Sequence, residues 1–290
     1  MTKCNIMNTR RNFIRTAALG AAASVMAPAI GKGYPALAKG SSSRASAAPY
    51  KIGVAGFTFA HFNIDQSIAM MNRIGVADLS LKDFHLPLNS TPEKISEVLG
   101  RFKAGGINIY AVGVIYMTSK DAIDKAFDYT RKVGVPLMIG VPAPDLIDYT
   151  EQKVKEYDIR IAIHNHGPED KLYPHPKMVY DLIKDRDKRM GLCLDIGHSQ
   201  RAGADPVTMV KQYGHRIYDM HIKDVTAAQR DGKAIEIGRG MINFPGLVKE
   251  LYKQKYNGHC SIEFEKDMTD PLPGIAESIG YFKGVTAATA

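Results

Sequence analysis

The feature that most constrains the fold is a regular alternation of extended and helical segments, repeated eight times from Tyr50 onward. Short apolar runs alternate with amphipathic segments of about ten to fifteen residues, a pattern typical of βαβ units and a parallel sheet. Eight such units in about 240 residues predict a single α/β domain, a (β/α)8 or TIM barrel, which typically takes about 250 residues. The predicted strands are Lys51–Thr58, Ala77–Leu81, Ile107–Val114, Leu137–Val141, Ile159–His164, Gly191–Asp195, Arg216–His221 and His259–Glu263.

The predicted helices carry recognisable start and stop signals. The second begins with the capping sequence Ser90-Thr91-Pro92-Glu93, and the third begins at Ser119 and ends at Gly134. A doubly wound open sheet is the alternative, but GVAGFTFAHF after the first strand lacks the G-x-G-x-x-G spacing of that fold. The predicted helices are Phe62–Ile74, Thr91–Ala104, Ser119–Val133, Leu146–Glu156, Lys177–Lys188, Val207–Tyr213, Pro245–Tyr256 and Pro271–Phe282.

Residues 1–49 have the pattern of a targeting segment. Asn8–Ala23 places Arg10-Arg11 before Phe13, Ile14 and an alanine-rich run, which resembles a twin-arginine export signal. The apolar run is too short for a stable membrane span, and A-x-A cleavage sites end at Ala38 and Ala47. We therefore expect a cleavable signal and linker over residues 1–49, the barrel over residues 50–290, and an exported, periplasmic protein without a membrane span after cleavage. A disordered N-terminal tail is the alternative.

This segment also accounts for the basic charge. The chain has 38 Lys and Arg against 30 Asp and Glu, but seven of the basic residues and none of the acidic ones lie in residues 1–49. Residues 50–290 are therefore close to neutral, which gives no support for binding to nucleic acid or a membrane surface. Of the three cysteines, Cys4 lies in the signal, while Cys193 and Cys260 lie inside predicted strands and are expected to be packed thiols.

Four consecutive predicted strands end in residue types that bind metals, namely His164, Asp195, His221 and Glu263. The C-terminal ends of barrel strands meet at one face, where ligands and chemistry are found. Two imidazoles and two carboxylates suit one Mn²⁺, Zn²⁺, Co²⁺ or Fe²⁺ ion, whereas Mg²⁺ prefers an all-oxygen set. Each residue alone has a plainer explanation, such as a hydrogen-bonded loop histidine, a turn aspartate, or a glutamate paired with Lys82 or Lys223. The four together favour a metal site.

Strand alternation places further polar residues beside these four. Lys223 shares the face of His221, and Glu265 shares the face of Glu263, so both are expected next to the ligands and facing a substrate. Asp219 lies on the same face one layer deeper, where a structural ion pair is the expected role. Lys82, His85 and His166 follow strand ends as well, with substrate contact and a solvated loop as equal alternatives. His198 is expected beside the ligands or on the substrate.

The motifs CLDIGHS, DMHIKD, GRGMINF and YNGHCSIEFE resemble the xylose-isomerase-like TIM-barrel superfamily, in its branch of sugar phosphate isomerases and epimerases. The similarity extends from Tyr50 to the end of the chain and is strongest in Ile159–Glu265. It implies a divalent metal held at strands 5 to 8, usually by Glu, Asp, His and Glu. The last three fall on Asp195, His221 and Glu263, whereas strand 5 carries His164 where many relatives have the glutamate of an E-N-H-G sequence.

The resemblance implies a metal-dependent sugar isomerase or epimerase, acting on a ketose or related free sugar through a metal-bound enediolate. In such enzymes the two ligand glutamates also move the protons, so the replacement by His164 leaves only Glu263 in that role. A lyase or hydratase acting on a 3-keto-sugar or keto-glycoside is the alternative, and the expected export favours it. The catalytic candidates are Glu263, His166, Glu169 and Lys223, and the substrate-binding candidates are Lys82, His85, His198, Glu265 and Arg239 of the Gly238-Arg239-Gly240 loop, where a plain loop arginine is equally expected.

Two other classes of protein are disfavoured. A DNA-repair endonuclease with this barrel would need a larger histidine-rich zinc site and a basic face, which the near-neutral charge of residues 50–290 does not supply. A non-catalytic sugar-binding barrel would have no need of a complete set of four ligands. The expected partner is therefore a small-molecule sugar and not nucleic acid, and the sequence contains no signal for an oligomeric state.

Overall fold

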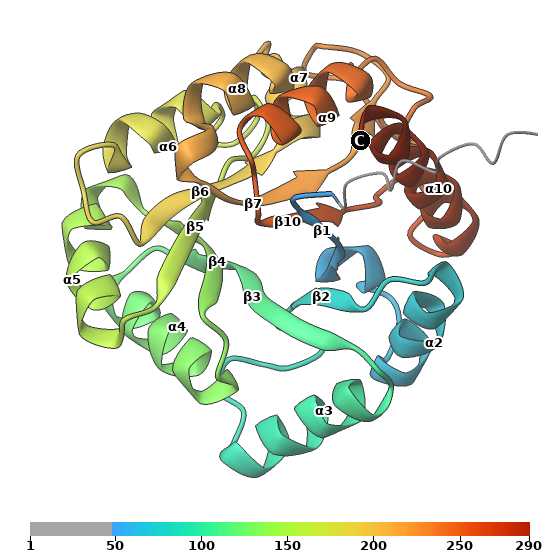
Figure 1. The fold of residues 1–290 in the computed structure, drawn as a ribbon. Helices are drawn as coiled ribbons and strands as arrows, with labels where there is room; N and C mark the ends of the chain where they lie inside the picture. Colours follow the sequence, from blue (N-terminus) through green and yellow to red (C-terminus); the bar gives the residue numbers. More distant parts are fainter. Residues whose placement is uncertain (1–47) are drawn as a thin grey trace, which may run out of the picture. The chain divides into compact units, whose positions relative to one another are not determined.

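Parallel strands close into a barrel in residues 48–290, which are the residues that the structure, a computed structural model, describes (Figure 1). Each strand pairs with its neighbour in the chain, and β1 pairs with β10 from Lys51 opposite His259 to close the ring. The barrel strands are β1 (Lys51–Ala55), β2 (Asp78–Leu81), β3 (Asn108–Met117), β4 (Leu137–Pro142), β5 (Arg160–His164), β6 (Met190–Asp195), β7 (Ile217–Ile222) and β10 (His259–Ile262). The predicted (β/α)8 barrel is confirmed.

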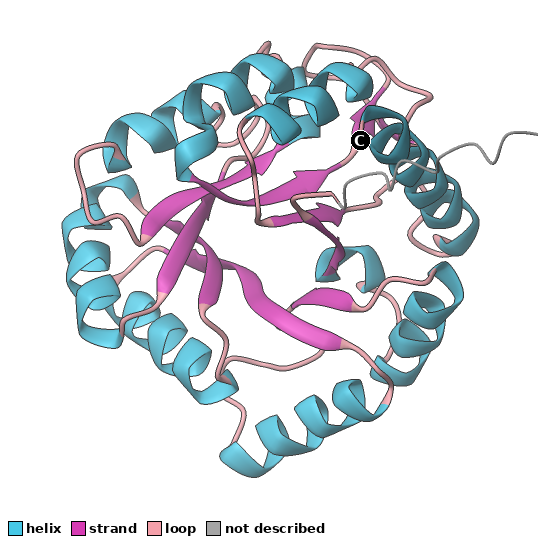
Figure 2. Cartoon of the chain, viewed as in Figure 1, coloured by secondary structure: helices cyan, strands magenta, loops and turns pink. Residues whose placement is uncertain are grey.

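The helices surround the barrel (Figure 2), and the last helix packs beside α9 and α2. They are α2 (Ile64–Ile74), α3 (Pro92–Ala104), α4 (Lys120–Val133), α5 (Ile147–Tyr157), α6 (Pro176–Ile183), α7 (Ile196–Arg201), α8 (Pro206–Tyr213), α9 (Phe244–Lys253) and α10 (Leu272–Thr289), with short 3-10 turns at Gly56–Phe59, Pro144–Leu146 and Gly214–Arg216. No helix within residues 48–290 is both long and apolar enough to cross a membrane.

The predicted capping signals operate as expected. Thr91 accepts a hydrogen bond from the backbone N–H of Lys94 at the start of α3, and Ser119 accepts one from Ala122 at the start of α4. Helix α4 ends at Gly134, whose φ of 80° is a left-handed conformation that glycine adopts without strain. The twin-arginine signal and its cleavage sites lie outside the described residues.

Some element bounds differ from the prediction. Strand β3 continues three residues beyond the predicted end, which carries Tyr116 to the C-terminal rim of the barrel. Helix α7 follows β6 without a loop, and β8 (Asp224–Val225) pairs with β9 (Ala234–Ile235) as a small hairpin after β7. Neither of these short elements was expected, because each has too few residues to show a periodic apolar pattern.

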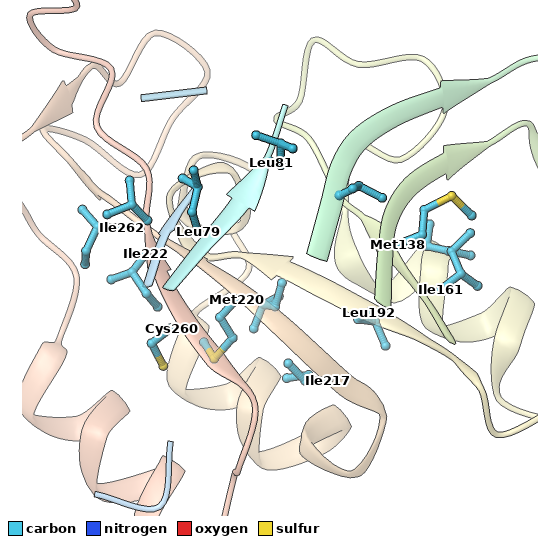
Figure 3. Packing of buried hydrophobic residues seen from close by; sticks show 14 of the residues in the cluster. Leu79, Leu81, Met138, Ile161, Leu192, Ile217, Met220, Ile222, Cys260 and Ile262 are labelled. Carbon is cyan, nitrogen blue, oxygen red and sulfur yellow. The ribbon is translucent and has the colours of Figure 1, made fainter. Parts of the chain in front are cut away.

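Alternation along the strands divides the apolar core into two layers. Side chains such as Leu192, Met220 and Ile262 point away from the barrel axis and pack with the helices (Figure 3). A smaller set fills the barrel interior, including Tyr110, Ile139 and Cys193. Cys193 and Cys260 therefore lie in different layers, and both are free, buried thiols as predicted. Because Asp195 follows Cys193 by two residues, it also points inward, at the C-terminal end of the barrel.

Candidate active site

Four side chains of metal-binding type meet at the C-terminal ends of β5, β6, β7 and β10. Nε2 of His164 lies 3.1 Å from Nδ1 of His221, which in turn lies 3.1 Å from Oε2 of Glu263. Oδ2 of Asp195 lies 3.6 Å from His164 Nε2 and 4.0 Å from His221 Nδ1. All four side chains are buried, and their donor atoms lie within 4.8 Å of one another. The structure thus brings together the four residues that the strand ends indicated as ligands.

Asp195 is placed by its position between β6 and α7. Its Oδ1 accepts a hydrogen bond of 2.8 Å from the backbone N–H of His198 and so caps the first turn of α7. Its Oδ2 is left to face the other three side chains. Asn165, which follows β5 and is fully buried, accepts the backbone N–H of Asp195 at 3.1 Å and donates to Ser199 on α7. The ends of β5 and β6 are therefore held in a fixed relation.

The donor atoms suit a single divalent ion. A tetrahedral site with metal–ligand bonds of about 2.0–2.2 Å places its ligand atoms about 3.4 Å apart. The four donor pairs in direct contact here are 3.1 to 4.0 Å apart, which is close to that spacing. Two nitrogen and two oxygen donors favour a transition metal or zinc over magnesium. The four residues therefore fit a divalent metal.

Lys223 extends into the same group. It directly follows β7, and its ammonium nitrogen lies 3.0 Å from Asp195 Oδ2 and 2.7 Å from Glu263 Oε2. The same nitrogen lies 3.1 Å from Oε2 of Glu265. Lys223 is 3% exposed in side-chain area, so these are contacts of a buried charge with little competition from water. Lys223 and Glu265 thus lie beside the four metal-type side chains, as strand alternation predicted.

The charges in this cluster stabilise one another. Burial acts to raise the pKa of Asp195, but the Lys223 ammonium and a hydrogen bond from His164 outweigh it and hold that pKa well below its usual value. Burial likewise opposes ionisation of Glu263, yet His221 and Lys223 lower its pKa. Burial also acts against the Lys223 ammonium, but the carboxylates raise its pKa well above the usual value. The carboxylates of Asp195 and Glu263 are therefore ionised, as metal ligands must be.

The histidines of the site differ in charge. Burial lowers the pKa of His164 to about 3 and that of His198 to about 4, so both rings are neutral near pH 7. Burial opposes the charged form of His221 too, but the Glu263 carboxylate at 3.1 Å raises its pKa well above the usual value. His221 Nδ1 then donates its hydrogen to Glu263 Oε2. Metal binding at this nitrogen would release that proton.

A cavity of about 250 Å³ opens beside these residues. Its lining includes His164, His166 and His198 together with Glu263 and Glu265. The partly exposed aromatic rings of Phe57 and Tyr116 also belong to it. Tyr116 Oη lies 2.9 Å from Nε2 of His166, and the two rings are stacked. The remaining lining residues are Lys82 and Val114, and Lys82 contacts Asp83 at 2.9 Å and the carbonyl oxygen of Val114 at 2.7 Å.

Three of the predicted site residues lie elsewhere. His85 is buried and donates from Nε2 to the carbonyl oxygen of Phe62 at 2.8 Å, so its ring packs behind the β2 loop and does not line the cavity. Arg239 forms an exposed ion pair with Glu277 on α10. Glu169 forms an ion pair of 2.8 Å with Arg201 and is not part of the cavity lining. In each case a local partner determines where the side chain lies.

Sequence reasoning missed several residues that shape the site. Tyr116 and Phe57 line the cavity, but β3 was predicted to end before Tyr116, and aromatic residues at strand ends are common in cores. Asp224 is fully buried and accepts the backbone N–H groups of Gly238, Gly240 and Ile242, which fixes the glycine loop after β9. The sequence did contain a sign of this role, because the last aspartate of DMHIKDV, Asp224, lies among apolar residues and needs hydrogen-bond partners when it is buried.

Several curated relatives match part of the chain, two of which illustrate the extent of the similarity. Rhizopine catabolism protein MocC of Rhizobium meliloti is 27% identical over 145 residues, covering 45% of this chain and 44% of that protein. Inosose dehydratase of Clostridium botulinum is 31% identical over 105 residues, covering 31% of this chain and 34% of that enzyme. The matched segments thus span less than half the length of either relative.

Solved structures share the fold over almost their whole length. A protein of Parabacteroides distasonis is 26% identical, with a TM-score of 0.64, and the match covers 82% of this chain and 99% of that protein. The zinc-bound IolI protein has a TM-score of 0.63 at 16% identity, which shows a common fold, with coverage of 82% and 97%. The sequence profile of the xylose isomerase-like TIM barrel family matches residues 89–285, more than half of the chain. On this evidence, the chain belongs to the xylose isomerase-like TIM barrel family.

Proposed function

We propose that the protein is a metal-dependent lyase that removes water or an alcohol from a keto-sugar or keto-cyclitol by elimination. The observation that carries this proposal is the distribution of carboxylates in the cavity. Glu263 belongs to the four-donor group, while Glu265 lines the same cavity outside that group. On the β5 side the lining consists of imidazoles. One carboxylate free of the metal group suits elimination, which needs a single group to remove the proton from carbon.

Glu265 is the proposed proton acceptor. Its carboxylate takes the proton from the carbon next to the substrate carbonyl, and the C–H electron pair forms the new carbon–carbon double bond. The bond to the leaving oxygen breaks, and its electron pair stays on that oxygen. Glu265, now protonated, returns the proton to the leaving oxygen, so that water or an alcohol departs and the residue is regenerated. The Lys223 ammonium, 3.1 Å away, orients Glu265 for both transfers.

His164, Asp195, His221 and Glu263 would hold the divalent ion. When bound, the ion supplies Lewis-acid stabilisation of the negative charge that develops on the carbonyl oxygen. The rings of Phe57 and Tyr116 give the cavity an apolar surface against which the substrate can pack. The small volume of the cavity, about 250 Å³, matches a substrate whose reacting part is a single six-membered ring.

The relatives support the class of substrate. Inosose dehydratase, as its name states, removes water from an inosose, which is a keto-cyclitol. A fold neighbour is a probable 3-DHS dehydratase, and another is similar to D-tagatose 3-epimerase. Among them the sequence relatives named as dehydratases support elimination as the reaction of this chain.

The test uses purified protein loaded with Mn²⁺, Zn²⁺ or Co²⁺ and a panel of inososes, 3-keto-sugars and 3-keto-glycosides in D₂O, followed by NMR. We expect a new vinylic proton signal together with released water or aglycone. Glu265→Gln should abolish this turnover even when enough metal is added to fill the site. Metal-loaded protein that neither eliminates nor exchanges protons on the whole panel would overturn the proposal.

An isomerase or epimerase is the second candidate, because His166 offers another proton-transfer group. His166 follows β5 and Glu265 follows β10, and these two strands are separated in the barrel by β6 and β7. Its ring nitrogen lies 2.9 Å from Tyr116 Oη within the cavity lining. In the same NMR experiment, deuterium incorporation with retention of every carbon–oxygen bond would favour this reaction over elimination.

We also propose that residues 1–49 direct export by the twin-arginine route. The support is the order of Arg10-Arg11, Phe13 and the alanine-rich run in the sequence. Replacing Arg10 and Arg11 by lysine should retain the protein in the cytoplasm of a bacterial host, whereas Arg15→Lys should leave its distribution unchanged. Equal export of all three proteins, measured by fractionation and N-terminal sequencing, would contradict the proposal.

A further inference from the structure

We propose that Lys223 is an internal counter-ion that competes with the metal, so that metal binding displaces its ammonium group from Asp195 and Glu263 toward Glu265. The inference rests on the proposed metal site but not on the reaction that follows. It assigns Lys223 a positioning role, in which one lysine links the occupancy of the metal site to the arrangement of the proposed catalytic carboxylate.

The competition follows from shared atoms. Lys223 Nζ contacts Oδ2 of Asp195 at 3.0 Å and Oε2 of Glu263 at 2.7 Å. These are the same two oxygens that face the imidazole nitrogens of His164 and His221, at 3.6 and 3.1 Å. Oδ1 of Asp195 is already engaged by the backbone of α7. A metal ion held by the four residues would therefore take the oxygens that the ammonium now contacts.

The two cations are also repelled by one another. A divalent ion within a few ångströms of a buried ammonium group is strongly disfavoured, because the protein interior screens charge less than water does. Lys223 must therefore move when the ion binds. A weaker metal affinity than the four donors alone would give is the direct consequence of this repulsion.

Two features of the structure favour movement of the ammonium toward Glu265. The aliphatic stem of Lys223 passes directly over Gly197, where a Cβ atom would come within 2.3 Å of Lys223 Cγ, so the stem is confined on that side. Glu265 lies 3.1 Å from the ammonium and is more exposed than Asp195 or Glu263, with 27% of its side-chain area accessible. Glu265 also lines the cavity. Movement toward Glu265 thus brings the lysine to the place where a substrate binds.

The experiment measures metal affinity, without any substrate, in Lys223→Met and in the control Lys82→Met. Lys82 lines the same cavity, but its ammonium contacts Asp83 and the carbonyl of Val114 instead of the metal-type ligands. We expect Zn²⁺ or Co²⁺ to bind at least about tenfold more tightly to Lys223→Met than to the unmodified protein, and less than about threefold more tightly to Lys82→Met. Isothermal titration calorimetry with a competing chelator gives both values.

A second variant tests the direction of movement. Glu265→Gln removes the alternative partner of the ammonium, so it should weaken metal binding when it is the only substitution. Added to Lys223→Met, the same substitution should weaken metal binding less, because no ammonium remains to be displaced. Glu169→Gln, at a carboxylate paired with Arg201, should leave affinity unchanged. Unchanged or weaker binding in folded Lys223→Met would overturn the proposal. If Lys223→Met does not fold, equal affinities for Glu265→Gln and Glu169→Gln would overturn it.

Discussion

The ammonium nitrogen of Lys223 and Nδ1 of His221 contact the same oxygen atom, Oε2 of Glu263, at 2.7 and 3.1 Å. This oxygen is therefore the point at which the positive groups of the site converge. Its removal should affect the metal and the charge balance together.

Glu263→Gln is expected to reduce metal affinity by at least about 100-fold, because it removes a ligand, and loss of even an outer partner of a ligand costs about 10–100-fold. It should also abolish turnover. Metal titration and the NMR assay give the two values. Glu277→Gln, which breaks only the exposed pair with Arg239, is the control and should leave both unchanged. Full metal affinity in Glu263→Gln would remove this residue from the ligand set.

Asp195→Asn and Asp195→Ala separate the two roles of Asp195. Both remove the charge that faces the site, so both should lose metal binding. Asparagine still offers an oxygen to the backbone N–H of His198, whereas alanine does not, so Asp195→Ala should be about 1 kcal/mol less stable than Asp195→Asn. Urea denaturation of the metal-free proteins measures this difference. Equal stability would show that the contact with α7 contributes nothing.

Tyr110→Phe should destabilise the protein by about 1–3 kcal/mol, since it leaves a buried carboxylate oxygen without its donor. Tyr110 donates to Oδ2 of Asp219 at 2.7 Å and lies 2.6 Å from Oγ of Ser261, inside the barrel and below the site. Tyr281→Phe, at an exposed ring on α10, is the matched control and should change stability by less than about 0.5 kcal/mol. Similar unfolding midpoints for the two variants would contradict this role.

His85 is expected to make folding stability depend on pH. Burial lowers its pKa below the usual value of 6.5, so the unfolded chain binds a proton that the folded protein does not. The contribution of His85 to folding stability is therefore complete above the pKa that this histidine has in the unfolded chain. It declines as the pH falls through that pKa toward the lower pKa of the folded protein. The stability difference between the unmodified protein and His85→Gln should shrink between about pH 8 and about pH 5. The other buried histidines are common to both proteins and cancel in this difference, so a constant difference would contradict the assignment.

The barrel and the convergence of four side chains could be predicted because both follow from strand alternation. Asp195 and Glu263 point inward for the same reason that Leu194 and Ile262 point outward, and the strand runs show this parity directly. The ends of parallel strands in a barrel must meet at one face. No further information was needed to bring His164, Asp195, His221 and Glu263 together.

Loop residues could not be predicted in this way, because their side chains follow local partners. His85 turns away to the carbonyl of Phe62, and Arg239 turns outward to Glu277. Asp219 was expected in an ion pair, but it is held by the hydroxyl of Tyr110, which lies on a strand distant in sequence. Tyr116 entered the cavity only because β3 is longer than its apolar run indicated. Periodicity contains no information on such contacts.

The division of the two Asp195 oxygens between α7 and the site gives the protein a built-in reporter. The backbone N–H of His198 is hydrogen-bonded to one oxygen while the other faces the metal-type donors. Ordering of this carboxylate by an ion should therefore slow the exchange of the His198 amide hydrogen with solvent. A single amide at the start of one short helix would then register whether the centre of the barrel is occupied.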